Sequence, residues 1–186
     1  MVDFLLILDF ESTSVDPQTC RVLEVAATLV SFPGLDLIDS YTAVIDHAAP
    51  DHLAAAKADP IVGPMHTANG LFDDIDAGRG IFLHEAEAAI LSVLDRHGSG
   101  AKNVALAGSG VAHFDLQVIA TRMPALHTRL AYWTLDIGPI RRAIAAWVPT
   151  EHRPADTNAT KSHRAADDVA CHLADLITYR DFFRSL

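Results

Sequence analysis

The chain has 186 residues, of which 50% are hydrophobic and 20% are charged, and this size and composition suit one globular domain with a sizeable core. Its net charge of −10 argues against a generic duplex-binding protein, because such proteins need a basic surface to displace phosphate counterions. Two cysteines cannot form a disulfide framework, and no apolar stretch approaches the roughly 20 residues of a membrane helix. We therefore expect a soluble, cytoplasmic protein with free thiols and no signal peptide.

The first part of the chain predicts three strands. Phe4–Phe10 is a nearly continuous apolar run of strand length, as in a strand buried at the centre of a sheet. Arg21–Phe32 and Leu35–Asp46 are also strand-like, and the Pro-Gly turn between them predicts a hairpin. The stretch 48–80 is rich in proline and turn residues, so we expect mainly loops there.

The rest of the chain predicts alternating helices and strands. Strand-like runs cover Asn103–Ala107 and Leu130–Ile137. Helical spacing covers four further segments: Ile81–His97, His113–Arg122, Gly138–Val148 and His163–Phe183. Three strands followed by this alternation indicate an α/β layer fold with a mixed sheet. Because we find no repeat, low-complexity tract or linker, we interpret residues 1–186 as a single domain.

Two acidic residues end the first predicted strand. Asp9 and Glu11 are separated by one residue, so on a strand both carboxylates point to the same face. Like charges at the rim of a buried sheet are unfavourable unless a cation lies between them, and Mg²⁺ prefers carboxylate oxygens. The pair is thus a candidate metal site, and the alternative is a solvated strand end whose acids contact only water.

A further acidic residue follows the predicted strand at Asn103–Ala107. Gly108–Gly110 forms a glycine-rich turn, and Asp115 lies in the first turn of the helix that comes next. Because an acid in a first turn complements the helix dipole, spacing alone favours a structural role for Asp115 over a catalytic one.

The start of the last predicted helix carries the third group of polar residues. Ser162 or Thr160 can cap this helix, and Asp167 and Asp168 complement its dipole. The helical wheel puts both aspartates away from the apolar side and does not choose between them. His163 can form an ordinary surface contact with Asp167. Near metal-bound carboxylates it is instead a candidate general base, because its unperturbed pKa lies close to neutral pH.

Together these segments resemble the three exonuclease motifs of the DEDDh superfamily, and most closely those of the oligoribonuclease family. Asp9–Thr13 resembles the first motif and Gly108–Leu116 resembles the second. His163–Asp168 resembles the third, in which a histidine is followed by four residues and an aspartate, and this spacing selects Asp168 over Asp167. Similar runs extend the likeness over nearly the whole chain: Leu23–Ala26, Met65–Leu71, Leu135–Ile137 and Tyr179–Phe183.

The resemblance implies a ribonuclease H-like α/β fold, with a mixed central sheet of about five strands flanked by helices. It implies a 3′→5′ exonuclease that releases nucleoside 5′-monophosphates from short single-stranded RNA or DNA, and a homodimer. By analogy, Asp9, Glu11 and Asp168 would bind two divalent cations, Mg²⁺ or Mn²⁺, with Asp115 helping directly or through water. His163 would take the proton from the attacking water.

The resemblance also implies contacts with the substrate. Val15 stands at the position where the family has a leucine that wedges against a terminal base, and His66 lies in a matching His-Thr pair. The residues that we expect near the substrate on these grounds are Ser12, Thr13, Val15, His66 and Tyr132.

Other positions depart from the family. Its base-stacking tryptophan is replaced by Ile61, and its arginine that contacts a 5′ phosphate across the dimer is replaced by Trp133. A serine of the family is Gly138 here, and we expect Trp133 to be an interface or core aromatic. Because stacking stabilises a bound base by about 1–3 kcal/mol, these departures predict activity on short single strands without a sharp preference for dinucleotides.

Two other functions remain open. One is a proofreading or repair DNA exonuclease, which a DNA-only substrate profile would favour. The other is a catalytically silent, dimeric binding protein. Silent relatives usually lose a metal carboxylate, whereas this chain keeps the five motif residues, and we therefore favour an enzyme. These residues are Asp9, Glu11, Asp115, His163 and Asp168.

Overall fold

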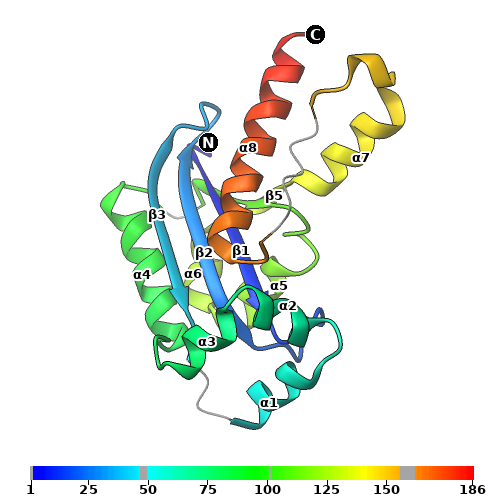
Figure 1. Ribbon diagram of the computed structural model, residues 1–186. Coiled ribbons are helices and arrows are strands. Elements are labelled where there is room, and N and C mark those ends of the chain that lie inside the picture. Colours follow the sequence, from blue (N-terminus) through cyan, green and yellow to red (C-terminus); the bar gives the residue numbers. More distant parts are fainter. Residues whose placement is uncertain (1, 47–49, 101, 156–161) are drawn as a thin grey trace.

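The computed structural model describes residues 2–46, 50–100, 102–155 and 162–186 (Figure 1). Its centre is one five-stranded sheet with the strand order β3-β2-β1-β4-β5. The strands β1, β2 and β3 pair antiparallel, whereas β4 pairs parallel with β1 and with β5, so the predicted mixed sheet and hairpin are confirmed. The strands are β1 (Phe4–Ser12), β2 (Val22–Ser31), β3 (Leu37–Val44), β4 (Val104–Gly108) and β5 (Leu130–Asp136).

The central strand β1 extends beyond its parallel neighbour. Leu5–Leu8 has no exposed side chain, as expected for a strand with a neighbour on each side and helices on both faces. The pairing with β4 ends at Ile7, whereas the pairing with β2 continues to Ser12. The last residues of β1 therefore have one backbone edge that β4 does not cover.

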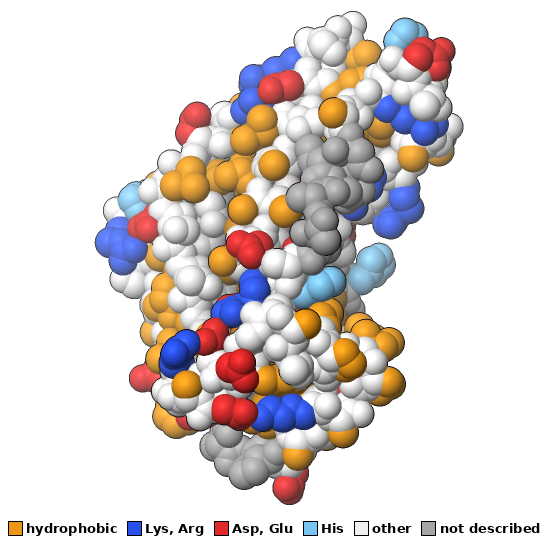
Figure 2. All heavy atoms as spheres, in the orientation of Figure 1, with side chains coloured by type: hydrophobic (Ala, Val, Ile, Leu, Met, Phe, Trp, Pro, Cys, Tyr) orange, Lys and Arg blue, Asp and Glu red, His pale blue; other side chains and the backbone are white. Residues whose placement is uncertain are grey.

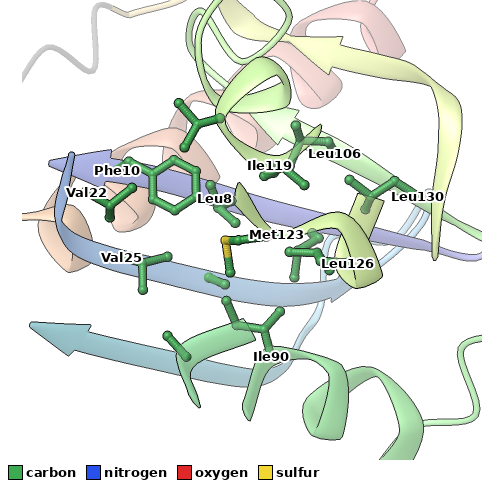
Figure 3. Packing of buried hydrophobic residues seen from close by; sticks show 14 of the residues in the cluster. Leu8, Phe10, Val22, Val25, Ile90, Leu106, Ile119, Met123, Leu126 and Leu130 are labelled. Carbon is green, nitrogen blue, oxygen red and sulfur yellow. The ribbon is translucent and has the colours of Figure 1, made fainter. Parts of the chain in front are cut away.

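Helices cover both faces of the sheet (Figure 1). The helices α4 (Leu83–Arg96), α5 (Asp115–Arg122) and α6 (Pro124–Arg129) lie on one face, where Figure 3 shows their apolar side chains packed against Leu8 and Phe10 of β1. The helices α7 (Ile137–Trp147) and α8 (Ala165–Arg184) cover the other face and contact its odd-numbered β1 residues, Leu5 and Ile7. Because side chains alternate along a strand, Asp9 and Glu11 share the α8 face.

The prediction of loops at 48–80 is wrong for the described part of that stretch; residues 48 and 49 lie outside it. The structure has α1 (Pro50–Ala58), α2 (Val62–Ala68) and α3 (Leu71–Asp76) there. Their apolar residues, among them Val62, Leu71 and Phe72, pack around Leu23 of β2. The prolines of this stretch are compatible with these helices. They stand at the first position of a helix, between two helices or in the first turn of a helix, and no helical hydrogen bond is lost at these places.

The remaining elements follow the sequence pattern, with two additions. The predicted helix that ends near Pro124 is followed at once by α6, which begins at that proline. A short 3₁₀ helix, η1 (Thr150–His152), follows α7. No helix among the described residues combines the length and the apolar character that crossing a bilayer requires.

Candidate active site

The carboxylates of Asp9 and Glu11 lie at the uncovered end of β1. Asp9 is half-buried, and Glu11 is buried with 6% of its surface exposed. Glu11 is paired across the strands with Glu24 of β2, so two acids face each other at this edge. The prediction that Asp9 and Glu11 share a face agrees with the register of the strand.

The beginning of α8 brings Asp168 and His163 to the same place. One potential ligand atom each from Glu11, His163 and Asp168 lies within 4.8 Å of the other two, so these three residues could hold a metal ion. Asp168 is 3% exposed, whereas its neighbour Asp167 is exposed and accepts a 2.6 Å hydrogen bond from Ser162. The helical wheel predicted that both aspartates lie away from the apolar side of the helix. This prediction is wrong for Asp168, because the first turn of α8 packs against β1.

Asp115 is the first residue of α5 and is also buried, with 4% of its surface exposed. Burial raises the pKa of its carboxyl to about 7. The backbone N–H groups of Asp115 and Phe10 stabilise the carboxylate and partly oppose this rise, and the charge of Asp136 adds to it. The contact with Phe10 joins the second motif to the first, because Phe10 lies between Asp9 and Glu11.

Asp136 at the end of β5 was not predicted as a site residue. Its carboxylate accepts hydrogen bonds from the backbone N–H groups of Gly110 at 3.0 Å, Ala112 at 3.3 Å and Gly138 at 2.9 Å. It thus fixes the loop that leads to Asp115 and caps α7 at the same time. An aspartate two residues before the predicted helix Gly138–Val148 was the available signal for this role.

A carboxylate from another element caps α8. The predicted cap Ser162 does not, and the other predicted cap, Thr160, lies outside the described residues. The backbone N–H of Ala165 donates to Glu24 at 2.9 Å. Arg164 is the residue before the helix and has no capping side chain, and its guanidinium also binds Glu24, at 2.7 Å. Sequence spacing could not find this contact, because Glu24 and Arg164 are 140 residues apart.

The five residues expected near the substrate differ in exposure. Val15 and Tyr132 are 92% and 95% exposed, and both are therefore accessible to a ligand. Ser12 donates to the backbone oxygen of Ser14, and the hydroxyl of Thr13 accepts from the backbone of Arg21, so both support the loop after β1.

His66 of α2 is fully buried, so a direct contact with substrate would require its side chain to become exposed. Its Nε2 atom lies 3.6 Å from a carboxylate oxygen of Glu11, and its ring meets that of Phe72 edge-on. Burial lowers the pKa of His66, which favours the neutral imidazole behind Glu11.

An open cleft of about 520 Å³ lies between α2 and the start of α8. His163, Asn69 and Met65 are among its lining residues. Figure 2 shows acidic and basic side chains next to one another on the surface around α1, α3 and the start of α8. Trp133 lies elsewhere, half-buried against Phe32, as a core aromatic.

Comparison with curated proteins gives consistent similarity along the whole chain. The oligoribonuclease of Corynebacterium diphtheriae is 30% identical over 178 residues, which cover 96% of this chain and 82% of that protein. The oligoribonuclease of Mycobacterium tuberculosis is 31% identical over 180 residues, which cover 97% of this chain and 81% of that protein. No family model matches the chain.

Among solved structures, the fold is similar to exonuclease I. The Escherichia coli enzyme in complex with a 5cy-dT13 oligonucleotide has a TM-score of 0.64 at 16% identity and matches all of this chain. Exonuclease I from Methylocaldum szegediense has a TM-score of 0.65 at 17% identity and matches 98% of it. This chain spans less than half of either structure, 43% and 42%, and the likeness concerns the fold. The predicted ribonuclease H-like architecture is thus confirmed, and by its similarity to the curated relatives the chain belongs to the oligoribonuclease family.

Proposed function

We propose that the protein is a metal-dependent 3′→5′ exonuclease that releases nucleoside 5′-monophosphates from short single-stranded RNA or DNA. The observation that carries this proposal is the convergence of Glu11, His163 and Asp168, from two distant parts of the chain, within 4.8 Å of one another. Membership of the oligoribonuclease family supports the same activity, because the relatives bear that name.

The donor set fits divalent cations. Glu11, Asp115 and Asp168 are all more than nine-tenths buried, and buried carboxylates are costly unless positive charge or hydrogen bonds compensate them. Oxygen donors of this kind suit Mg²⁺ or Mn²⁺, and we assign Asp9, Glu11, Asp115 and Asp168 as the residues that hold two such ions. When bound, the ions lower the pKa of water and stabilise negative charge on the leaving 3′ oxygen.

The side chains of the chain itself supply orientation and proton transfer. His163 is exposed at the cleft, where its imidazole can accept a proton from a water molecule that attacks the terminal phosphodiester. His66 packs behind Glu11 and limits the movement of that carboxylate, as residues behind a metal ligand commonly do. Asp136 fixes the loop that carries Asp115.

The substrate is a short single strand. A net charge of −10 disfavours tight binding to long nucleic acids, since few positive charges are available to neutralise phosphates. Ser12, Thr13, Val15, His66 and Tyr132 are the residues that we assign to the surroundings of the substrate, with Val15 as an apolar wedge.

We infer from the family that residues 1–186 form one exonuclease domain, that two copies form a homodimer and that the protein acts in the cytoplasm. Multi-angle light scattering of the purified protein tests the dimer. A mass of about 20 kDa, that of one chain, would contradict it.

The activity is tested with 5′-labelled RNA and DNA oligomers of two to about twenty nucleotides, incubated with Mg²⁺, Mn²⁺ or EDTA. The expected result is a metal-dependent ladder that shortens from the 3′ end and is absent with the Asp9→Ala variant. Folded protein that yields no ladder with either metal would support a silent binding protein instead.

A DNA exonuclease is the second candidate function. The solved structures with a similar fold include exonuclease I bound to a DNA oligonucleotide, although their identity of 16% limits that likeness to the fold. The same assay separates the two candidates. Degradation of DNA alone would favour the second, and degradation of RNA favours an oligoribonuclease.

A further inference from the structure

His163 lies outside regular structure, in the segment Ser162–Arg164 that precedes α8. Its side chain is exposed, and its backbone φ of +54° is in the left-handed region that residues other than glycine rarely adopt. Such a conformation persists only where surrounding contacts hold it. The contacts that fix this segment therefore also fix the imidazole relative to Glu11 and Asp168.

Asn69, which follows α2, binds this segment through its side-chain amide. Its Nδ2 atom donates to the backbone oxygen of His163 and, at 3.3 Å, to that of Ser162. Its Oδ1 atom accepts from the backbone N–H of Leu71 at 3.1 Å, at the start of α3. Because the oxygen must face this N–H, the NH₂ group faces the two carbonyls. The amide thus joins the α2–α3 junction to the segment that carries His163.

Arg164 holds the same segment from its other end. Its guanidinium donates to Glu24 at 2.7 Å, to Asp74 at 3.0 Å and to the backbone oxygen of Asn69 at 3.3 Å. Glu24 faces Glu11 across the β1–β2 pair, so Arg164 also compensates one of two neighbouring acids. The residues Glu24, Asn69, Asp74 and Arg164 are called the anchoring cluster below.

We propose that the anchoring cluster holds His163 in the position from which it serves as the base, and that Asn69 is a positioning residue of the reaction. The inference rests on the proposed exonuclease function. Asn69 acts through the backbone of His163 and has no contact with the reacting atoms. Because proton transfer depends steeply on the distance between base and water, release of the segment lowers kcat and leaves KM nearly unchanged.

Two substitutions of Asn69 test this role. Asn69→Asp keeps the oxygen that accepts from Leu71 and replaces the donor with a charged oxygen, whereas Asn69→Ala removes both groups without adding charge. We expect each to lower kcat by about 10- to 100-fold with less than about a threefold change in KM. Thr67→Val is the matched control, because Thr67 is an exposed residue whose hydroxyl donates to the backbone oxygen of Gly63 within α2.

A double-mutant cycle with His163→Ala separates positioning from a general structural effect. If Asn69 acts only through His163, Asn69→Asp changes kcat by less than about twofold in the His163→Ala background. If the reductions in kcat caused by the two single substitutions multiply in the double variant, the proposal is overturned. Wild-type kcat in both Asn69 variants would overturn it as well.

Hydrogen exchange measured by mass spectrometry gives a readout that does not depend on activity. In EDTA, peptides that contain residues 162–166 should exchange faster in Asn69→Asp than in the wild type and in Thr67→Val. Equal exchange in all three proteins would contradict the anchoring. An inactive wild type with this difference in exchange would refute the exonuclease function and leave the anchoring itself supported.

Discussion

The ionisation of Asp115 depends strongly on its surroundings. Burial raises the pKa of its carboxyl from 3.8 to about 7. Between these two pH values the folded, metal-free protein holds a proton on Asp115 that the unfolded chain has lost. The contribution of Asp115 to the free energy of unfolding therefore falls as the pH rises from 3.8 to about 7.

We predict that Asp115→Asn removes this part of the pH dependence, because asparagine keeps the hydrogen-bond acceptor and carries no charge. In EDTA, the stability of the variant relative to the wild type should rise between about pH 4 and about pH 7 and level off above that range, as urea denaturation measures. Asp16→Asn is the control. Hydrogen bonding by Thr19 lowers the pKa of Asp16, so this substitution should not reproduce the gain that follows from the raised pKa of Asp115. A stability difference between wild type and Asp115→Asn that is constant over this range contradicts the prediction.

His163 is expected to contribute to catalysis and little to stability. Its side chain is exposed, so His163→Ala should lower kcat by about 10²–10⁴-fold and leave the thermal unfolding midpoint and the calorimetric binding of Mn²⁺ by the carboxylates nearly unchanged. His127→Ala, at an exposed histidine of α6, is the matched control. Full activity of His163→Ala would remove this residue as the base.

At the scale of elements, the turn between β4 and α5 depends on Gly108. Its φ is +149°, and an added Cβ would lie 2.6 Å from Val111 and 3.0 Å from the backbone oxygen of Leu8. We predict that Gly108→Ala lowers the free energy of unfolding by about 1–3 kcal/mol and also lowers activity, because this turn leads to Asp115.

Gly100→Ala is the control for Gly108→Ala. An added Cβ at Gly100 meets no atom within 4 Å, so its effect should stay within about 0.5 kcal/mol. Urea denaturation of both variants measures the difference. Equal stabilities would show that the turn tolerates a side chain at Gly108.

The elements that could be predicted from the sequence are those with a regular apolar pattern, such as β1 and α4. The helices α1 to α3 could not, because their prolines and short lengths are also typical of loops and only packing against Leu23 identifies them. The sequence placed Asp9 and Glu11 on one face, because strand periodicity depends on neighbouring residues alone. It could not choose Asp168 over Asp167 by periodicity, because that choice depends on which side of α8 meets β1.

At the scale of the whole molecule, contacts between distant segments complete the site. Arg164 and Glu24 are an example, since no local pattern links residues 140 positions apart. The chain has a net charge of −10, and Ile61 stands where the family has a stacking tryptophan. Both features predict weak, length-tolerant binding of single strands.

We therefore expect similar kcat/KM values for oligomers of two to about seven nucleotides, measured by separation of labelled products. Ile61→Trp should add a stacking surface, because Ile61 is exposed, and lower KM for the shortest substrates by about tenfold. A wild-type rate for dinucleotides far above that for longer oligomers would contradict this expectation.

The most direct test of the proposed active site compares two neighbouring aspartates of α8. Asp168→Asn and Asp167→Asn change the same chemical group, but Asp168 is buried beside Glu11 and Asp167 is exposed. With 5′-labelled RNA and DNA oligomers and Mg²⁺ or Mn²⁺, the wild type and Asp167→Asn should produce a ladder that shortens from the 3′ end, and Asp168→Asn should produce none. Equal activity of the two variants, or a ladder that persists in EDTA, would contradict a metal-dependent exonuclease at this site.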